Sequence, residues 1–437
     1  MFNSLDDSRV KAIHLRITAL SSAGYFLDGF DISIVSVAIL ILVTEFHLGA
    51  EEELLLIGST LIGMIFGGVL GGYFTDRNGR KSLYLWDMMF FVIFTILTAV
   101  SATYMELLLF RLLLGVAIGA DYAISPTIIA EYAPAKSRGR LLTISGLAWF
   151  IGAAFSYLMG YVFLPLGAES WRYMFLIGII PAIIVLVMRA SVPETPRWLA
   201  SQGKIAEAKE SIEKVVTGES IAGTAKQEKV SLKMLFSKRF IAATVFISIF
   251  WFILDAVTYV IALDGPTILV TLGLTSSRAS FTAAVIAIIA IFGGVLTFFF
   301  IDVAGRKIIT AIGFLGMALT LLVAGFILRG PPDIIAIVAL FIGFEIMQEM
   351  GPGITNSIYP QELYPTSIRA TAQGFGTTIS RIGAVIGIFT FGFIAAPFGY
   401  GVGMIFLAVL SVTGLAVTLI FGKETKGKSL EALAETK

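Results

Sequence analysis

Two acidic residues interrupt the first long apolar run of the sequence. The stretch FLDGFDISIV, residues 26–35, places Asp28 and Asp31 three positions apart, so their carboxyl groups share one face of a helix. An ionised side chain at the centre of a bilayer costs roughly 2.5–3.5 kcal/mol, and such residues usually face a cavity, a partner or a bound ligand. The pattern therefore predicts that at least one of the two carboxyl groups is functional.

Other apolar runs also contain charged side chains, namely Arg111, Asp121, Asp255, Glu345, Glu349 and Arg381. Together with Asp28 and Asp31 they make six acids against two arginines, so 6 − 2 = 4 acids would lack a cationic partner. A buried carboxyl group can bind and release a proton as its surroundings alternate. We therefore predict proton coupling by Asp28, Asp31, Asp121 and Asp255, with cation recognition and structural hydrogen bonding as alternatives.

Some of these charges share a helix face with aromatic or amide side chains. Residues three or four positions apart on a helix lie on one face. Such polar faces, which could line a substrate site, are Trp251, Asp255 and Tyr259 in one run, and Glu345, Gln348 and Glu349 in another. Arg381 either binds an anionic substrate or neutralises one of the two glutamates.

These side chains require membrane helices to position them. The chain of 437 residues is 57% hydrophobic and 14% charged, unlike ordinary soluble domains. Twelve runs approach the length of about 20 residues that spans the hydrocarbon core. They are Ile17–Val43, Leu54–Phe74, Leu83–Val100, Met105–Ile129, Leu141–Phe163, Tyr173–Met188, Phe240–Leu263, Phe281–Ile301, Ile308–Ile327, Ile334–Tyr359, Ala370–Ile394 and Val402–Phe421.

Basic residues concentrate in alternate loops, and only Arg172, Arg278 and Arg329 lie in loops on the opposite side. The positive-inside rule then places both termini in the cytoplasm of a multi-pass cell-membrane protein. The longest loop divides the chain into three predicted parts: a six-helix bundle at 1–189, a cytoplasmic linker at 190–239, and a second six-helix bundle with a short cytoplasmic tail at 240–437. The linker should contain an amphipathic helix with residues 205, 208, 212 and 215 on its apolar stripe.

The two halves of the chain repeat each other at a nearly constant offset. The matched residues are Asp28 with Asp255, Asp76 with Asp302, Arg80 with Arg306, Pro126 with Pro352, Glu131 with Glu362 and Arg138 with Arg369. The repeat predicts two pseudo-symmetric six-helix bundles that rock about a site at the membrane midplane. It also predicts that helices four and ten are broken at Pro126 and at GPG 351–353, and that Asp28 and Asp255 face each other across a cavity.

Four motifs resemble those of one transporter family. GGYFTDRNGRK at 71–81 and RLLLGVAIG at 111–119 resemble signatures of the major facilitator superfamily, and PETPRW at 193–198 and KETKGKSLE at 423–431 resemble those of its sugar-porter branch. The resemblance implies the all-α major facilitator fold of twelve transmembrane helices.

Within that branch, WFILDAVTYV at 251–260 and GADYAISPTIIAEY at 119–132 resemble phosphate:proton and organic-acid or metabolite:proton symporters. The resemblance implies that Trp251, Asp255 and Tyr259 line the substrate site together with Tyr122. Trp149 and Glu349 replace the Gln and Asn of the phosphate symporters. The predicted substrate site comprises Tyr122, Trp149, Trp251, Asp255, Tyr259, Glu345, Gln348, Glu349 and Arg381.

Charged residues at the helix ends lie in water, too far from the midplane to bind substrate there. Acid–base pairs at this depth could instead latch the two bundles in the outward-facing state, as the family resemblance also implies; topology alone would account only for the basic members. The predicted gating residues are Asp76, Arg77, Gly79, Arg80, Glu131, Arg138, Asp302, Arg306, Glu362 and Arg369.

The sequence therefore favours a proton-coupled secondary transporter that takes up a small polar metabolite, such as an organic acid or phosphate. A sugar or polyol porter is the alternative, followed by a membrane receptor. An enzyme is not expected, because the chain has no cysteine, only two histidines and no nucleotide-binding loop. We expect a monomer whose partners are a small-molecule substrate, protons and the bilayer, without cofactor, metal or nucleic acid.

Overall fold

The protein, a computed structural model, is described over residues 3–213, 231–330, 333–428 and 430; over these residues it is helical and contains no strand. Twelve stretches are long and apolar enough to cross a membrane, which confirms the predicted spans and the fold class. Their helices are α2 (Ala12–Glu45), α3 (Ala50–Asn78), α4 (Arg80–Ala99), α5 (Tyr104–Tyr132), α6 (Arg138–Phe163), α7 (Ser170–Leu176) with α8 (Ile179–Arg189), α11 (Ile241–Thr271), α12 (Ser276–Ala304), α13 (Arg306–Ile327), α14 (Ile334–Met350) with α15 (Pro352–Leu363), α16 (Arg369–Phe398) and α17 (Tyr400–Phe421).

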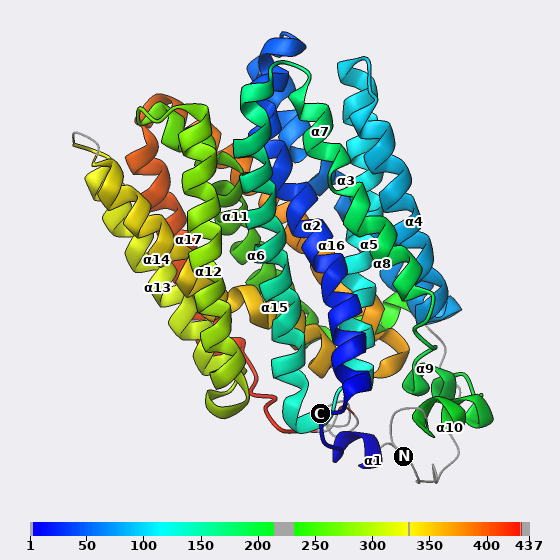
Figure 1. Ribbon diagram of the computed structural model, residues 1–437. Helices are drawn as coiled ribbons and strands as arrows, with labels where there is room; N and C mark the ends of the chain where they lie inside the picture. The colour runs from blue at the N-terminus through cyan, green and yellow to red at the C-terminus, as the bar shows by residue number, and fades with distance from the viewer. Residues whose placement is uncertain (1–2, 214–230, 331–332, 429, 431–437) are drawn as a thin grey trace.

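The spans run side by side, and the short helices α1 (Asn3–Asp6), α9 (Pro196–Ser201) and α10 (Ile205–Glu213) lie at one end of the bundle (Figure 1). We call this end, which also carries the α3–α4 and α12–α13 turns, the terminal face. On α10, Ala208 and Ile212 are buried as predicted, whereas Val215 lies outside the described residues. The division at residues 189 and 239 and the cytoplasmic location of the termini stay predictions.

The first six and the last six spans meet along two helix pairs, α3 with α16 and α6 with α12. Small residues allow the first pair to approach closely, because a Cβ added at Gly374 of α16 would overlap the carbonyl oxygen of Gly68 in α3. This contact brings the end of α3 that carries Asp76 against the beginning of α16. The cavity described below lies between the same two halves.

Of the two predicted helix breaks, only the second occurs. The helix α5 continues through Pro126 to Tyr132, so the prediction of a break in the fourth span is wrong. Proline removes one backbone hydrogen bond, which neighbouring helices can compensate in a membrane protein. The tenth span is interrupted at Gly351 (φ −138°, ψ −104°), where α14 ends inside the bundle and α15 begins with Pro352.

Candidate functional site

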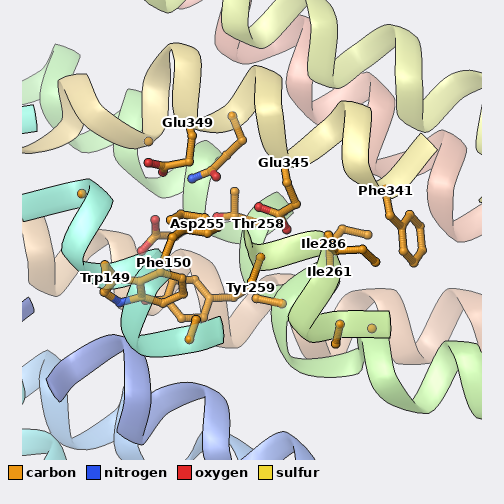
Figure 2. Close-up of a pocket in the computed structure, with 18 of the residues that line it drawn as sticks. Trp149, Phe150, Asp255, Thr258, Tyr259, Ile261, Ile286, Phe341, Glu345 and Glu349 are labelled. Atoms are coloured by element: carbon orange, nitrogen blue, oxygen red, sulfur yellow. The ribbon is translucent and has the colours of Figure 1, made fainter. Parts of the chain in front are cut away.

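A cavity lies between the two halves of the chain. The centre of a water molecule can occupy about 100 Å³ of it. Figure 2 shows Glu345 and Glu349 of α14 on one side and Trp149 and Phe150 of α6 on the other. The polar and aromatic residues that line it are Tyr25, Tyr122, Trp149, Phe150, Tyr157, Asp255, Thr258, Tyr259, Phe341, Glu345, Gln348, Glu349, Asn356, Ser357 and Arg381.

An ion pair between α16 and α11 forms part of the cavity wall. The guanidinium of Arg381 donates to the carboxylate of Asp255, and both side chains are almost fully buried. The Cζ atom of Arg381 lies 4.8 Å from the ring centroid of Tyr122 and 4.7 Å from that of Tyr259. A desolvated cation over an aromatic ring gains about 2 kcal/mol. The two rings and the carboxylate therefore hold a positive charge beside the cavity, where an anion can reach it.

Two carboxyl groups of α14 have no such partner. Glu345 and Glu349 line the cavity, and neither forms an ion pair with any Lys or Arg in the described part of the chain. The Oε2 atom of Glu349 and the Oε1 atom of Gln348 are buried without a hydrogen-bond partner. These acceptors can be satisfied by a proton, by water or by a donor group on a ligand.

The structure brings together the predicted substrate-site residues except one. Trp251 is 1% exposed, does not line the cavity, and packs against the backbone of Gly376. Sequence reasoning missed Tyr25, Phe150, Tyr157, Asn356 and Ser357, which do line it. Of these, only Tyr25 could have been found from the sequence, because it lies three positions before Asp28 on the same helix face. In the structure its ring contacts that of Tyr122, with the ring centroids 4.7 Å apart.

The predicted coupling acids of the first half, Asp28, Asp31 and Asp121, do not line the cavity, and two of them form ion pairs. Asp31 pairs with Arg111 at 3.4 Å, and Arg111 also donates to Thr60 at 2.7 Å. Asp121 pairs with Arg189 at 2.8 Å, and the same guanidinium contacts Asp87 at 3.2 Å. The roles of Asp31 and Asp121 in proton coupling stay predictions.

Two sequence-based interpretations need correction here. Arg189 and Asp87 are both buried and were both left out of the count of deep charges; with them the count is seven acids against three arginines, so the excess stays at 7 − 3 = 4, but Arg189 contacts two acids at once. Of the acids that the sequence predicted to lie deep in the membrane, Asp28, Glu345 and Glu349 have no ion pair within the described residues. Asp28 does not line the cavity, so Asp28 and Asp255 do not face each other across it; the charges around Asp28 are Asp121, Arg189 and Asp87 and, on the side of the cavity, Arg381.

At the terminal face, Asp76 joins the two halves. Its carboxylate accepts hydrogen bonds from the backbone N–H of Thr371 at 2.7 Å, from the Thr371 hydroxyl at 2.6 Å and from the Ala370 N–H at 3.3 Å. Ala370 and Thr371 lie in the first turn of α16, where the N–H groups lack partners within the helix and a negative charge is favoured. We call this contact the latch.

Arginines extend the latch across the same face. Arg80 pairs with Asp76 at 3.0 Å and with Glu131 at 2.8 Å, and Arg369 of the second half reaches Glu131 at 3.1 Å. All four side chains are buried. Arg77, which we also predicted to contribute, is exposed.

The repeat reproduces part of this network in the second half. Arg306 pairs with Asp302 at 2.8 Å and with Glu362 at 2.7 Å. Asp302 also accepts from the backbone N–H of Arg140 in the first half at 3.2 Å. The predicted gating residues of both halves therefore lie at the terminal face, while their role in gating stays a prediction.

The glutamates of the PETPRW and KETKGKSLE motifs bind helix N-termini. Glu194 accepts from the N–H groups of Arg80 and Lys81 at 3.1 and 3.2 Å, and Glu424 accepts from those of Arg306 and Lys307, both at 3.2 Å. A carboxylate at this place satisfies N–H groups that have no partner within α4 or α13. Burial raises the pKa of Glu194 from its ordinary value.

A glycine before each of these helices makes the contact possible. Gly79 and Gly305 have φ of +105° and +95°, a region that favours glycine. A Cβ at either position would also overlap the carboxylate of Glu194 or Glu424. Gly79, predicted as a gating residue, therefore positions the start of α4.

The N-terminal helix contributes a further contact to the terminal face. Asp6 lies between Arg138 at 3.0 Å and Arg197 at 2.9 Å, and all three side chains are buried. Arg138 also donates to the carbonyl of Lys428, near the other end of the chain, at 3.4 Å. Segments from both halves thus meet at Arg138.

The chain is similar to known transport proteins over nearly its whole length. Residues 17–436 match the family model described as "Sugar (and other) transporter". The chain is 31% identical to the putative metabolite transport protein YaaU of Escherichia coli over 98% of this chain and 96% of the relative. It is 28% identical to the niacin transporter NiaP of Acinetobacter baylyi over 99% of both chains.

Among solved structures, the proton:xylose symporter XylE of Escherichia coli superimposes with a TM-score of 0.84 at 25% identity, over 97% of this chain and 99% of XylE. The family model, the relatives and the fold all indicate membrane transport rather than enzymatic catalysis. The chain therefore belongs to the sugar (and other) transporter family of the major facilitator superfamily.

Proposed function

We propose that this transporter is a proton-coupled symporter that takes up a small anionic metabolite by alternating access. The observation that carries the proposal is the buried Asp255–Arg381 ion pair in the wall of the cavity between the two halves. Breaking a buried pair by removing one partner leaves an uncompensated charge that costs about 3–5 kcal/mol. Arg381 must therefore keep a negative partner, either Asp255 or a bound anion.

In the proposed cycle the substrate anion and Asp255 compete for Arg381. A proton on Asp255 removes its charge and leaves the guanidinium, still held between Tyr122 and Tyr259, available to the anion. Binding of the anion without a proton would place a second negative charge beside Asp255. Binding of a proton without the anion would leave Arg381 without a negative partner. Both intermediates are costly in a low-dielectric site, so the two ligands bind and leave together.

The latch at Asp76 closes the terminal face in the arrangement described here. If the termini are cytoplasmic, as predicted, the cavity must be reached from the outside in this state. Release of substrate then requires the latch to break and the two halves to rock apart at that face.

A sugar or polyol porter is the second candidate, and the similarity to the xylose symporter favours it. A neutral sugar, however, would not need the positive charge of Arg381 for binding. The relative named as a niacin transporter supports a charged substrate, since niacin carries a carboxylate group. We therefore rank the anion first.

The test is uptake into proteoliposomes by the full-length protein, with a panel of carboxylates, phosphate and sugars. We expect an inward proton gradient to drive accumulation of an anion by the wild type. Asp255→Asn should lose this accumulation but retain exchange of labelled for unlabelled substrate, which needs no net proton movement. Accumulation of a sugar independent of the proton gradient would overturn the proposal.

A further inference from the structure

The helix α14 ends beside the cavity, in the interior of the bundle. Its last turn contains Gln348 and Glu349, and Glu345 lies one turn earlier on the same face. The C-terminal end of a helix carries a partial negative charge. In transporters, half-helix C-termini inside the membrane commonly coordinate cations. The position therefore favours a positive group on a ligand.

The two carboxyl groups at this helix end have no balancing cation in the described residues. Arg381 is the only positively charged residue among the described residues that line the cavity, and it is paired with Asp255. Glu349 is 2% exposed and Gln348 is 8% exposed, yet the Oε2 atom of the first and the Oε1 atom of the second have no hydrogen-bond partner. An N–H donor with a positive charge could satisfy either of these oxygens.

The opposite wall suits an organic cation. Trp149 and Phe150 lie across the cavity from Glu345 and Glu349 (Figure 2). Aromatic faces attract ammonium groups and also bury the methylene groups attached to them. Among the described residues, no cluster of three or more His, Cys, Asp or Glu side chains is suited to a metal ion.

From these observations we propose that Glu345, Gln348 and Glu349 form a subsite for an organic ammonium group. The transported substrate is then amphoteric, with an anionic group at Arg381 and an ammonium group at the end of α14. This inference rests on the proposed function, because it takes the anion site at Arg381 as the other end of the substrate. It narrows the substrate class from anions to zwitterions.

The test measures binding of matched pairs to the purified full-length protein, by thermal stabilisation. Each pair consists of an ω-amino carboxylate and the alkanoate in which a methyl group replaces the ammonium group, from 3-aminopropanoate with butanoate to 6-aminohexanoate with heptanoate. We expect at least one zwitterion to bind ten-fold or more tightly than its alkanoate. Glu349→Gln should bring that ratio close to one, whereas Glu106→Gln, an exposed acid, should leave the ratio as in the wild type.

Equal binding of both members at every length, or binding of neither, would overturn the inference, because the carboxyl groups of α14 would then need only protons or water. Stabilisation by NaCl that Glu349→Gln abolishes, without any preference for zwitterions, would also overturn it in favour of an inorganic cation. Arg381→Lys and Arg381→Gln test the proposed function separately. If alkanoates bind Arg381→Gln, which has no positive charge, as well as they bind the wild type, the anion site is wrong, whatever the zwitterion preference; Arg381→Lys keeps the charge and should retain part of the binding.

Discussion

Replacing Asp76 with alanine should open the terminal face. The carboxylate receives two short hydrogen bonds from Thr371 of the other half, at 2.6 and 2.7 Å. A hydrogen bond to a charged group contributes about 1.5–3 kcal/mol, and neighbouring contributions are not additive. We therefore expect the closed arrangement to lose about 2–4 kcal/mol relative to the open one, in which water can satisfy these groups. This corresponds to a shift of about 30- to 700-fold in the equilibrium.

The opening of the terminal face can be measured as a distance between two spin labels, one on each half of the chain. The chain has no cysteine, so cysteines introduced at Asn78 and Lys238, exposed positions on the two halves, can be spin-labelled without background. Pulsed electron paramagnetic resonance in lipid nanodiscs should show mainly a short distance in the wild type and a new longer one in Asp76→Ala. Arg77→Ala, at the neighbouring exposed position, is the control. If a folded Asp76→Ala protein keeps the wild-type distances, or if Arg77→Ala changes them equally, the carboxylate of Asp76 does not hold the terminal face closed.

Three further perturbations follow from the same structure. Glu194→Ala and Glu424→Ala each remove the acceptor of two helix N–H groups, so each should lower the free energy of unfolding by about 1–3 kcal/mol; an unchanged melting temperature would contradict the capping role. Gly29→Ala should lower the free energy of unfolding by about 1–3 kcal/mol, because the added Cβ would overlap the backbone of α6. Gly392→Ala, where a Cβ would meet open space, should not lower it. Equal melting temperatures of the two variants would disprove the close contact. Asp6→Asn removes a charge from between two arginines and should populate the longer distance in the resonance assay; without that change, α1 takes no part in closure.

The spans and most of the cavity could be predicted because both depend on unusual residue types in an apolar background. Charged and amide side chains such as Glu345, Gln348 and Arg381 are costly in a membrane, so their presence alone indicates a cavity or a partner. Tyr157 and Phe150 escaped notice because an aromatic residue in an apolar run is equally compatible with lipid contact and with a cavity wall.

Long-range partners could not be predicted from one sequence. Arg189 lies at the edge of its span, and only the packing of α8 against α4 and α2 brings it to Asp87 and Asp121. Likewise, the backbone groups that Glu194 binds are more than a hundred residues away in the chain. Pro126 misled the prediction of a helix break, because the cost of one lost backbone bond depends on neighbours that the sequence does not identify.

In the proposed mechanism an anion binds at Arg381 only when Asp255 takes up a proton. The most direct measurement is the number of protons absorbed when substrate is added to the purified protein in weakly buffered solution, followed with a pH-indicator dye. We expect about one proton to be taken up per anion bound by the wild type, and none by Asp255→Asn, although the anion still binds to it. Anion binding by the wild type without proton uptake, or unchanged uptake in Asp255→Asn, would contradict it.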